Sequence, residues 1–181
     1  MAGNDLPIRK LVAAAVVACV VPAASFAAVD AFLKIDGVPG DVATKGHEKE
    51  IEVLSWSWGM DRAASNAGAG MVAGRPCVTE LNVTKLMDSS STKLMGAVIS
   101  GQNLGKAKLT LVKVSTEQPA GFFTLDMSNV QVSSFQVSGS SEVPAESVAL
   151  RFQSSTATFT PQRPDGSTGA PVPVAIKAGT C

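Results

Sequence analysis

The sequence predicts an all-β fold, a barrel of two packed sheets with one short helix. First, short strand-like runs separated by turn residues recur along most of the chain, and residues 51–58 show the clearest two-residue alternation. Second, only residues 91–100 have the apolar spacing of a helix. Third, 45% of the residues are hydrophobic and 17% are charged, which is enough apolar material for a core and argues against disorder. Many short strands with one helix are typical of a barrel or sandwich.

The N-terminus differs in character from the rest of the chain. Arg9 and Lys10 precede an apolar run over residues 11–21, and small residues flank a cleavage point between Ala27 and Ala28. A positive start, a short apolar run and a small-residue cleavage site are typical of a secretory signal peptide. The apolar run is too short to cross a bilayer as a helix.

We therefore expect residues 1–27 to be removed, which leaves one domain over residues 28–181. That domain would be secreted or periplasmic, with no stable membrane span. An alternative remains, because residues 16–19 loosely match a lipobox in which Cys19 becomes the acylated N-terminus. If the signal is not used, the chain would stay in the cytoplasm.

The first half of the domain is predicted to hold three strands. Residues 31–35 form the first, which ends at the turn residues Asp36 and Gly37. Residues 51–58 form the second, and residues 78–85 the third. Between these two, the Gly- and Ala-rich residues 59–76 are predicted to form a long loop or an extended hairpin.

The second half begins with the helix, for which Asp88, Ser89 and Ser90 are candidate caps and Gly101 a candidate end. Three further segments are expected to be strands or strand pairs: residues 106–114, 122–137 and 147–160. The last segment, residues 161–181, reads as a tail rich in Pro and Gly.

The charge balance excludes one large class of functions. Lys plus Arg number 15 and Asp plus Glu number 15, so the formal net charge is zero, and no basic cluster is visible. A nucleic-acid-binding protein normally carries a basic patch on one face. We therefore expect no nucleic-acid partner.

No residue pattern predicts a metal or cofactor site. His47, the only histidine, lies in a polar loop and is more typical of a surface or turn residue than of a ligand or acid–base group. The chain has no Cys-x-x-Cys motif and no paired histidines, which makes a zinc site improbable. No cofactor is expected.

One motif raises the possibility of an enzyme. Ser90 and Lys93 fit the S-x-x-K spacing of a serine nucleophile, but the companion S-D-N and K-T-G motifs are missing. Helix capping within a Ser-rich run explains the same residues. A serine hydrolase is therefore the third and least favoured hypothesis, and the chain is not expected to be an enzyme.

Two pairs of residues are candidates for covalent or subunit contacts. Cys77 and Cys181 would remain after signal cleavage, and an oxidising compartment allows them to form a disulfide. Two separate thiols, or a link from Cys181 between subunits, remain open. Trp56 and Trp58 share one face of the predicted strand, where paired aromatics are typical of a core or an interface.

An ordered set of short segments resembles the haemolysin co-regulated protein (Hcp) family of type VI secretion. It begins with the domain's first ten residues, A-V-D-A-F-L-K-I-D-G, and continues with S-W-S-W-G at residues 55–59. It then includes the segments at residues 88–93, 107–111, 132–135, 139–140, 146–148 and 159–162. No single segment is specific, but their order over most of the domain is.

The resemblance implies a β-barrel subunit that forms homohexameric rings, which stack into the inner tube of the secretion machine. It also implies effectors and spike proteins as partners. Residues 59–76 are expected to reach a neighbouring ring, and the possible subunit contacts are Trp56, Trp58, Ser65 and Asn66. The signal peptide departs from the family pattern, which leaves a secreted or periplasmic ring-shaped carrier, or effector-like binding protein, as the alternative.

Overall fold

The computed structural model describes residues 28–66, 71–113, 120–139, 142–163, 165 and 167–177. For residues 64–66, 71–73, 75 and 120 it describes the backbone only. The predicted signal peptide, including Cys19 and Ala27, lies outside the described residues, as does Cys181.

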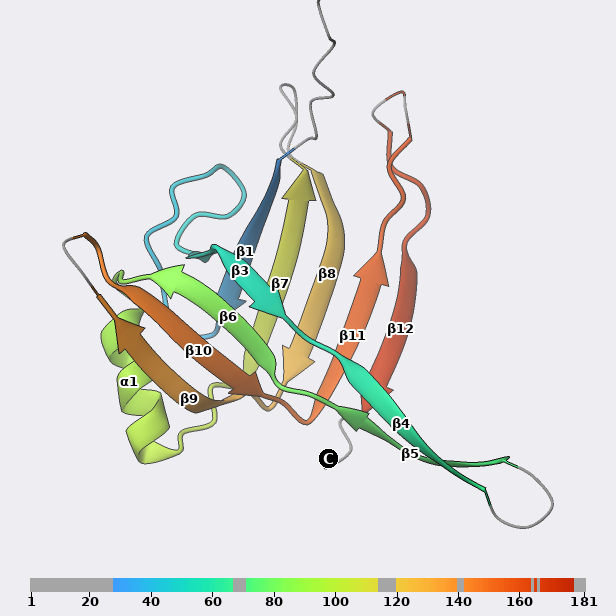
Figure 1. Cartoon of the computed structure of the whole chain (residues 1–181). Coiled ribbons are helices and arrows are strands. Elements are labelled where there is room, and N and C mark those ends of the chain that lie inside the picture. Colours follow the sequence, from blue (N-terminus) through green and yellow to red (C-terminus); the bar gives the residue numbers. More distant parts are fainter. Residues whose placement is uncertain are drawn as a thin grey trace, which may run out of the picture.

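The described residues form twelve strands and one helix (Figure 1). In chain order these are β1 (Val29–Ile35), β2 (Ile51–Val53), β3 (Ser55–Ser57), β4 (Met60–Asn66), β5 (Met71–Val78), β6 (Leu81–Leu86), α1 (Ser91–Ser100), β7 (Lys106–Lys113), β8 (Ala120–Ser128), β9 (Gln131–Ser138), β10 (Ala145–Arg151), β11 (Ser154–Phe159) and β12 (Val172–Lys177). The predicted fold class, mainly β with one short helix, is confirmed.

The strands form two main sheets and one separate hairpin. The six-stranded sheet has the order β12-β11-β8-β7-β1-β2, and the four-stranded sheet has the order β3-β6-β10-β9. Strands β4 and β5 pair only with each other. Every pairing is antiparallel, and Figure 1 shows the four-stranded sheet crossing in front of part of the six-stranded one.

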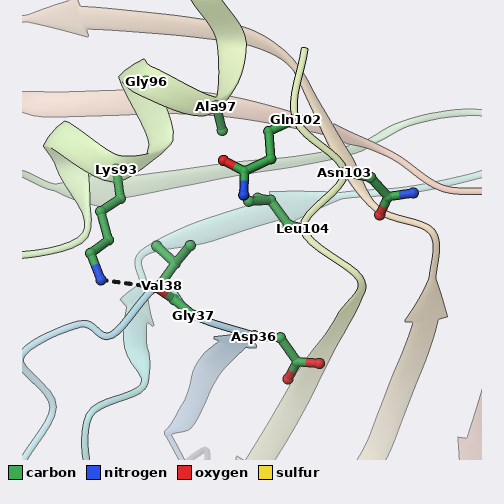
Figure 2. A pocket seen from close by; sticks show the side chains of 9 residues that line it. All are labelled: Asp36, Gly37, Val38, Lys93, Gly96, Ala97, Gln102, Asn103 and Leu104. Carbon is green, nitrogen blue, oxygen red and sulfur yellow. Dashed lines mark hydrogen bonds between the residues drawn. The ribbon is translucent and has the colours of Figure 1, made fainter. Parts of the chain in front are cut away.

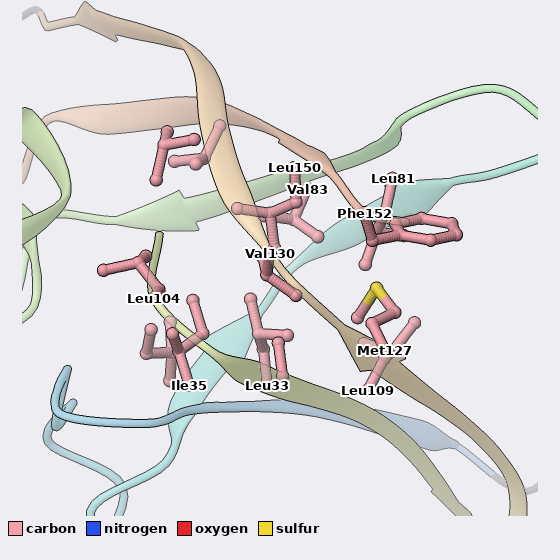
Figure 3. Packing of buried hydrophobic residues seen from close by; sticks show 14 of the residues in the cluster. Leu33, Ile35, Leu81, Val83, Leu104, Leu109, Met127, Val130, Leu150 and Phe152 are labelled. Atoms are coloured by element: carbon pink, nitrogen blue, oxygen red, sulfur yellow. The ribbon is translucent and has the colours of Figure 1, made fainter. Parts of the chain in front are cut away.

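The core lies between the two sheets. Leu33, Leu109 and Leu125 occupy directly paired positions on neighbouring strands of the six-stranded sheet, so their side chains point the same way, and all three are fully buried. Leu81 and Leu150 face them from the four-stranded sheet (Figure 3). Burying each such side chain contributes about 1.5–3 kcal/mol, so this apolar layer holds the sheets together.

The single strand predicted over residues 51–58 is wrong in one respect. The chain leaves the six-stranded sheet after Val53 and enters the four-stranded sheet at Ser55, so the segment is two short strands joined at Leu54. Burial alternates only before this corner, where Ile51 and Val53 are buried and Glu52 is exposed, whereas all three residues of β3 are exposed. A periodic pattern reports which way side chains point, and it does not report a change of sheet.

The Pro- and Gly-rich tail contains a strand that the sequence did not predict. Residues 172–177 form β12, which pairs along its whole length with β11. Strand β12 is an edge strand, and Pro173 fits there because an edge strand can lose a backbone donor. The two prolines in and before this strand conceal its alternating Val and Ile residues.

The helix has the predicted bounds, but its N-terminal cap does not follow the prediction for Ser90. Gly101 ends α1 in the left-handed conformation with φ 64°, a conformation that glycine adopts without steric cost. Ser90 occupies the cap position but makes no capping hydrogen bond through its side chain. Its hydroxyl donates to Asp88 Oδ1, and its backbone N–H donates to the same atom.

A buried ionic network joins the helix to the four-stranded sheet. The Lys85 ammonium on β6 donates to Glu146 Oε2 on β10 at 2.6 Å and to Ser91 Oγ at 3.1 Å, and it lies 2.7 Å from Asp88 Oδ1. Ser91 Oγ in turn donates to Glu146 Oε2 at 2.8 Å. Lys85 and Glu146 are each 1% exposed. Such charges are stable in a core only when they are paired and hydrogen-bonded, so these contacts fix where α1 begins.

Candidate assembly interface

The hairpin of β4 and β5 stands apart from the two main sheets. Its two strands pair extensively only with each other, and Figure 1 shows them running away from the body of the subunit. We call β4 and β5 the arm. Residues 59–76 were predicted to form a loop or an extended hairpin, and the described part of this segment is a hairpin.

The arm's pairing depends on one close backbone approach. A Cβ atom added at Gly74 would lie 2.6 Å from the carbonyl oxygen of Ala63, closer than side-chain atoms approach backbone. The register shifts between Arg62 and Ala64, beside this contact, as in a β-bulge. Glycine allows the two strands to approach closely at such a bulge. The shape of the arm is therefore encoded by its own residues.

The predicted contact residues Ser65 and Asn66 lie on β4, paired with Val72 and Met71. Cys77 lies at the base of the arm, opposite Asp61, and it is disulfide-bonded. Since Cys181 lies outside the described residues, the pairing of Cys77 with Cys181 stays a prediction.

The two tryptophans take different environments. Trp56 is 39% exposed, and its ring stacks on Phe123 of the six-stranded sheet with 6.5 Å between centroids and 9° between planes. Trp58 is half-buried and packs against the core, and its Nε1 has no hydrogen-bond partner among the described residues. Trp56 therefore has an open apolar surface for a partner, whereas Trp58 mainly completes the core.

The serine–lysine motif does not form a nucleophilic dyad. Ser90 is fully buried and its hydroxyl binds Asp88, while the Lys93 ammonium donates to the Gly37 carbonyl oxygen at 2.9 Å. The two side chains thus have separate partners. The proposed serine hydrolase has no support in this geometry.

Beside Lys93 lies an open hollow of about 490 Å³ between α1 and the turn after β1 (Figure 2). It is lined by Asp36, Gly37, Val38, Lys93, Gly96, Ala97, Gln102, Asn103 and Leu104. Its ionisable side chains are those of Asp36 and Lys93, and the Lys93 ammonium is bonded to the Gly37 carbonyl oxygen.

His47 packs against the sheet instead of standing free in its loop. Its ring stacks on the buried Phe32 ring, with 4.3 Å between centroids and 16° between planes, and Nδ1 lies 2.7 Å from Glu50 Oε2. Among the described residues no cluster of His, Cys, Asp and Glu could hold a metal ion. In the same part of the chain, no helix has both the length and the apolar character to cross a membrane.

The sequence reasoning missed the buried network around Lys85. A signal was present in the two-residue alternation of both strands. Lys85 is two residues after Val83 and so points inward like Leu81 and Val83. Glu146 likewise points inward with Val148 and Leu150. Charged residues at inward strand positions on two segments predict a buried pair. The register confirms it, since Glu146 lies directly opposite Lys85.

Comparison with known proteins agrees with this architecture. A family described as "Type VI secretion system effector, Hcp" matches residues 32–159. The chain is 39% identical over 149 residues to the protein Hcp1 of Pseudomonas aeruginosa, which covers 80% of this chain and 92% of that protein.

Solved structures give the same result. A type six secretion system protein superposes with a TM-score of 0.77 and 29% identity, covering 83% of this chain and 96% of that one. Hcp1 from Salmonella typhimurium superposes with a TM-score of 0.64 and 26% identity, covering 84% and 95%. With the family match spanning most of the domain, the chain belongs to the Hcp family of structural proteins of type VI secretion, as its ordered sequence segments indicated.

Proposed function

We propose that this chain is the subunit of a homohexameric ring, and that such rings stack into the inner tube of a type VI secretion system. The observation that carries this proposal is the arm, which leaves the body of the subunit and pairs only with itself. Ordering a residue costs about 1–2 kcal/mol in backbone entropy. A long hairpin whose strands pair only with each other therefore suits contact with another subunit.

The proposed partners follow from the same architecture. Within a ring the subunit contacts its own copies, and between rings the arm contacts the next ring. By family membership, type VI effectors and spike proteins are the further partners of the assembled tube. The proposed role is structural, with no catalytic residue.

The arm can be tested by shortening it. Replacing residues 63–75 with Asn-Gly keeps Arg62 and Pro76 paired across a two-residue turn, because Asn-Gly favours the hairpin turn. We expect single rings of unchanged subunit number and no stacked tubes, measured by electron microscopy and native mass spectrometry. Tubes formed by the shortened protein would contradict the role of the arm.

A milder variant checks that shortening has not merely damaged the fold. Ser65→Asp with Asn66→Asp places two negative charges at the predicted contact positions of β4 and leaves the arm's length intact. If these positions meet a neighbouring ring, desolvating the charges disfavours stacking, and the tubes should shorten. Unchanged tube length would exclude Ser65 and Asn66 as contacts.

The disulfide at Cys77 favours a second candidate, an exported ring-shaped carrier or effector-like binding protein. Disulfides persist in oxidising compartments and are rare in the cytoplasm. We propose that the bond joins Cys77 to Cys181 and that residues 1–27 are cleaved before Ala28. Mass spectrometry of the native N-terminus from cell fractions separates the candidates: a chain starting at Ala28 in the periplasm or medium supports export, and an uncleaved cytoplasmic chain supports the tube.

A further inference from the structure

The apolar face of the six-stranded sheet is wider than the sheet that covers it. In one row of paired positions, Ala31, Leu111, Phe123, Phe159 and Val172 all point to the core side. Ala31 and Leu111 are buried, Phe123 is half-buried, and Phe159 and Val172 are 50% and 57% exposed. Exposure of the row thus rises steadily toward the β12 edge.

The neighbouring row repeats this change. Leu33, Leu109 and Leu125 are fully buried, Ala157 is half-buried, and Val174 on β12 is 57% exposed. We call the group Phe159, Val172 and Val174 the uncovered face. Figure 1 shows β11 and β12 to the right of most of the four-stranded sheet, with β4 passing across only their lower ends in this view. The uncovered face continues the hydrophobic core, and no part of the subunit that the structure describes buries it.

A single exposed apolar side chain, that of Ile99, lies at the other side of the subunit. Helix α1 lies to the left in Figure 1, at the far end of the four-stranded sheet from β11 and β12. Ile99 is 88% exposed on this helix, and its neighbours one turn back and one residue on, Gly96 and Ser100, are small and exposed. The side chain of Ile99 therefore projects beyond the small residues around it.

The two surfaces fit a contact between copies. One is a shallow apolar sheet face, the other a helix with a projecting isoleucine, and they lie on opposite sides of the same chain. Two different surfaces that bind one another form a heterologous contact, which closes into a ring when the rotation between copies is right. Pro173 removes a backbone donor from the β12 edge, which disfavours strand addition there. The contact therefore uses the face of β12 and not its edge.

We propose that the uncovered face of one copy packs on α1 of the next copy around Ile99. This inference rests on the proposed ring and names the two surfaces that close it. The partner is a second copy of this chain, and each copy gives one surface to each neighbour.

The test uses two single-residue variants of the purified protein, Ile99→Lys and Val174→Lys. Both positions are more than half exposed, so both variants should fold, which circular dichroism checks. A buried lysine without a partner carries a large desolvation cost, so each variant alone should fall from the ring to the mass of one chain in native mass spectrometry. The matched control is Ala175→Lys, on the opposite face of β12, which should keep the ring.

Mixing the two variants gives the decisive result. Ile99→Lys keeps an intact uncovered face and Val174→Lys keeps an intact helix, so a 1:1 mixture has one good interface. We expect a dimer in the mixture and no larger species. A mixture that stays monomeric overturns the inference, as do rings formed by either variant alone.

The wild-type protein, measured in the same experiment, distinguishes failure of the proposed ring from failure of the proposed contact. If it forms rings and the two variants also form them, this contact is wrong and the proposed ring stands. If the wild-type protein itself stays a single chain, the proposed ring fails and this contact fails with it.

Discussion

His47 shows how one side chain can anchor a long loop to a sheet. Phe32 is on the outer side of the six-stranded sheet, opposite the inward-pointing Leu33, and the His47 ring covers it. Glu50 also holds the imidazole, through the contact of its Oε2 with Nδ1. The loop between β1 and β2 is thereby held against the sheet at the position where the chain turns toward β2.

Replacing His47 by Ala should destabilise the fold by about 1–2 kcal/mol, because the stacked ring contact is lost and Phe32 is exposed to water. His47→Phe keeps the stacking and loses only the contact with Glu50, so it should cost less. Urea unfolding of the three proteins measures this order. A His47→Phe variant as unstable as His47→Ala would show that the polar contact, not the ring, holds the loop.

Asp41 in the same loop links stability to pH. Hydrogen bonds from the Ser89 side chain and from the Ser89 backbone N–H, the latter 3.0 Å from Oδ2, lower the pKa of the Asp41 carboxyl below its usual range. A carboxyl whose pKa is lower in the folded than in the unfolded state stabilises the fold at pH values above the unfolded-state pKa. This stabilisation is lost as the pH falls through the folded-state pKa.

Asp41→Asn should therefore melt at a lower temperature than wild type at pH 7, and the difference should shrink in acid, below the ordinary aspartate pKa of about 3.9. Thermal unfolding monitored at both pH values measures it. A difference that is equally large in strong acid would mean that the charge of Asp41 plays no part.

At the scale of elements, α1 depends on its polar contact with the four-stranded sheet as well as on Leu94 and Ala97, which are buried. Lys85 is the only cation in this network, and its ammonium pairs with the carboxylates of both Glu146 and Asp88. Removing one partner of a buried pair leaves the other charge without compensation, whereas removing both with apolar residues of similar size is often neutral.

Lys85→Met should therefore destabilise the protein by about 3–5 kcal/mol. The double variant Lys85→Met with Glu146→Leu should recover a large part of that loss. Chemical unfolding of both variants measures the difference. A double variant less stable than Lys85→Met would contradict the uncompensated-charge explanation.

The elements also show what a sequence can and cannot predict. The bounds of α1 were predictable because Leu94, Val98 and the ending Gly101 are local signals. The break at Leu54 was not, since the residue types alternate across it in the sequence and no Gly or Pro marks the corner. Strand β12 was not predictable, because Pro171 and Pro173 hide its pattern. The strand forms by pairing with β11, and a local pattern does not report that pairing.

At the scale of the whole molecule, the structure is two sheets of unequal width and a projecting arm. The narrower sheet leaves the β11–β12 end of the wider one uncovered, and the arm adds a second surface beyond the body (Figure 1). The ring contact that we propose depends on this difference in width, which no local motif encodes. The sequence could therefore indicate the family and the arm, but not the uncovered face.

Native mass spectrometry of the purified wild-type protein, combined with electron microscopy of the same sample, tests the central claim most directly. The account predicts six-chain species that appear as rings and, at high concentration, as stacks of rings. A single-chain mass that persists at high concentration, with no ring-shaped particles, would contradict it.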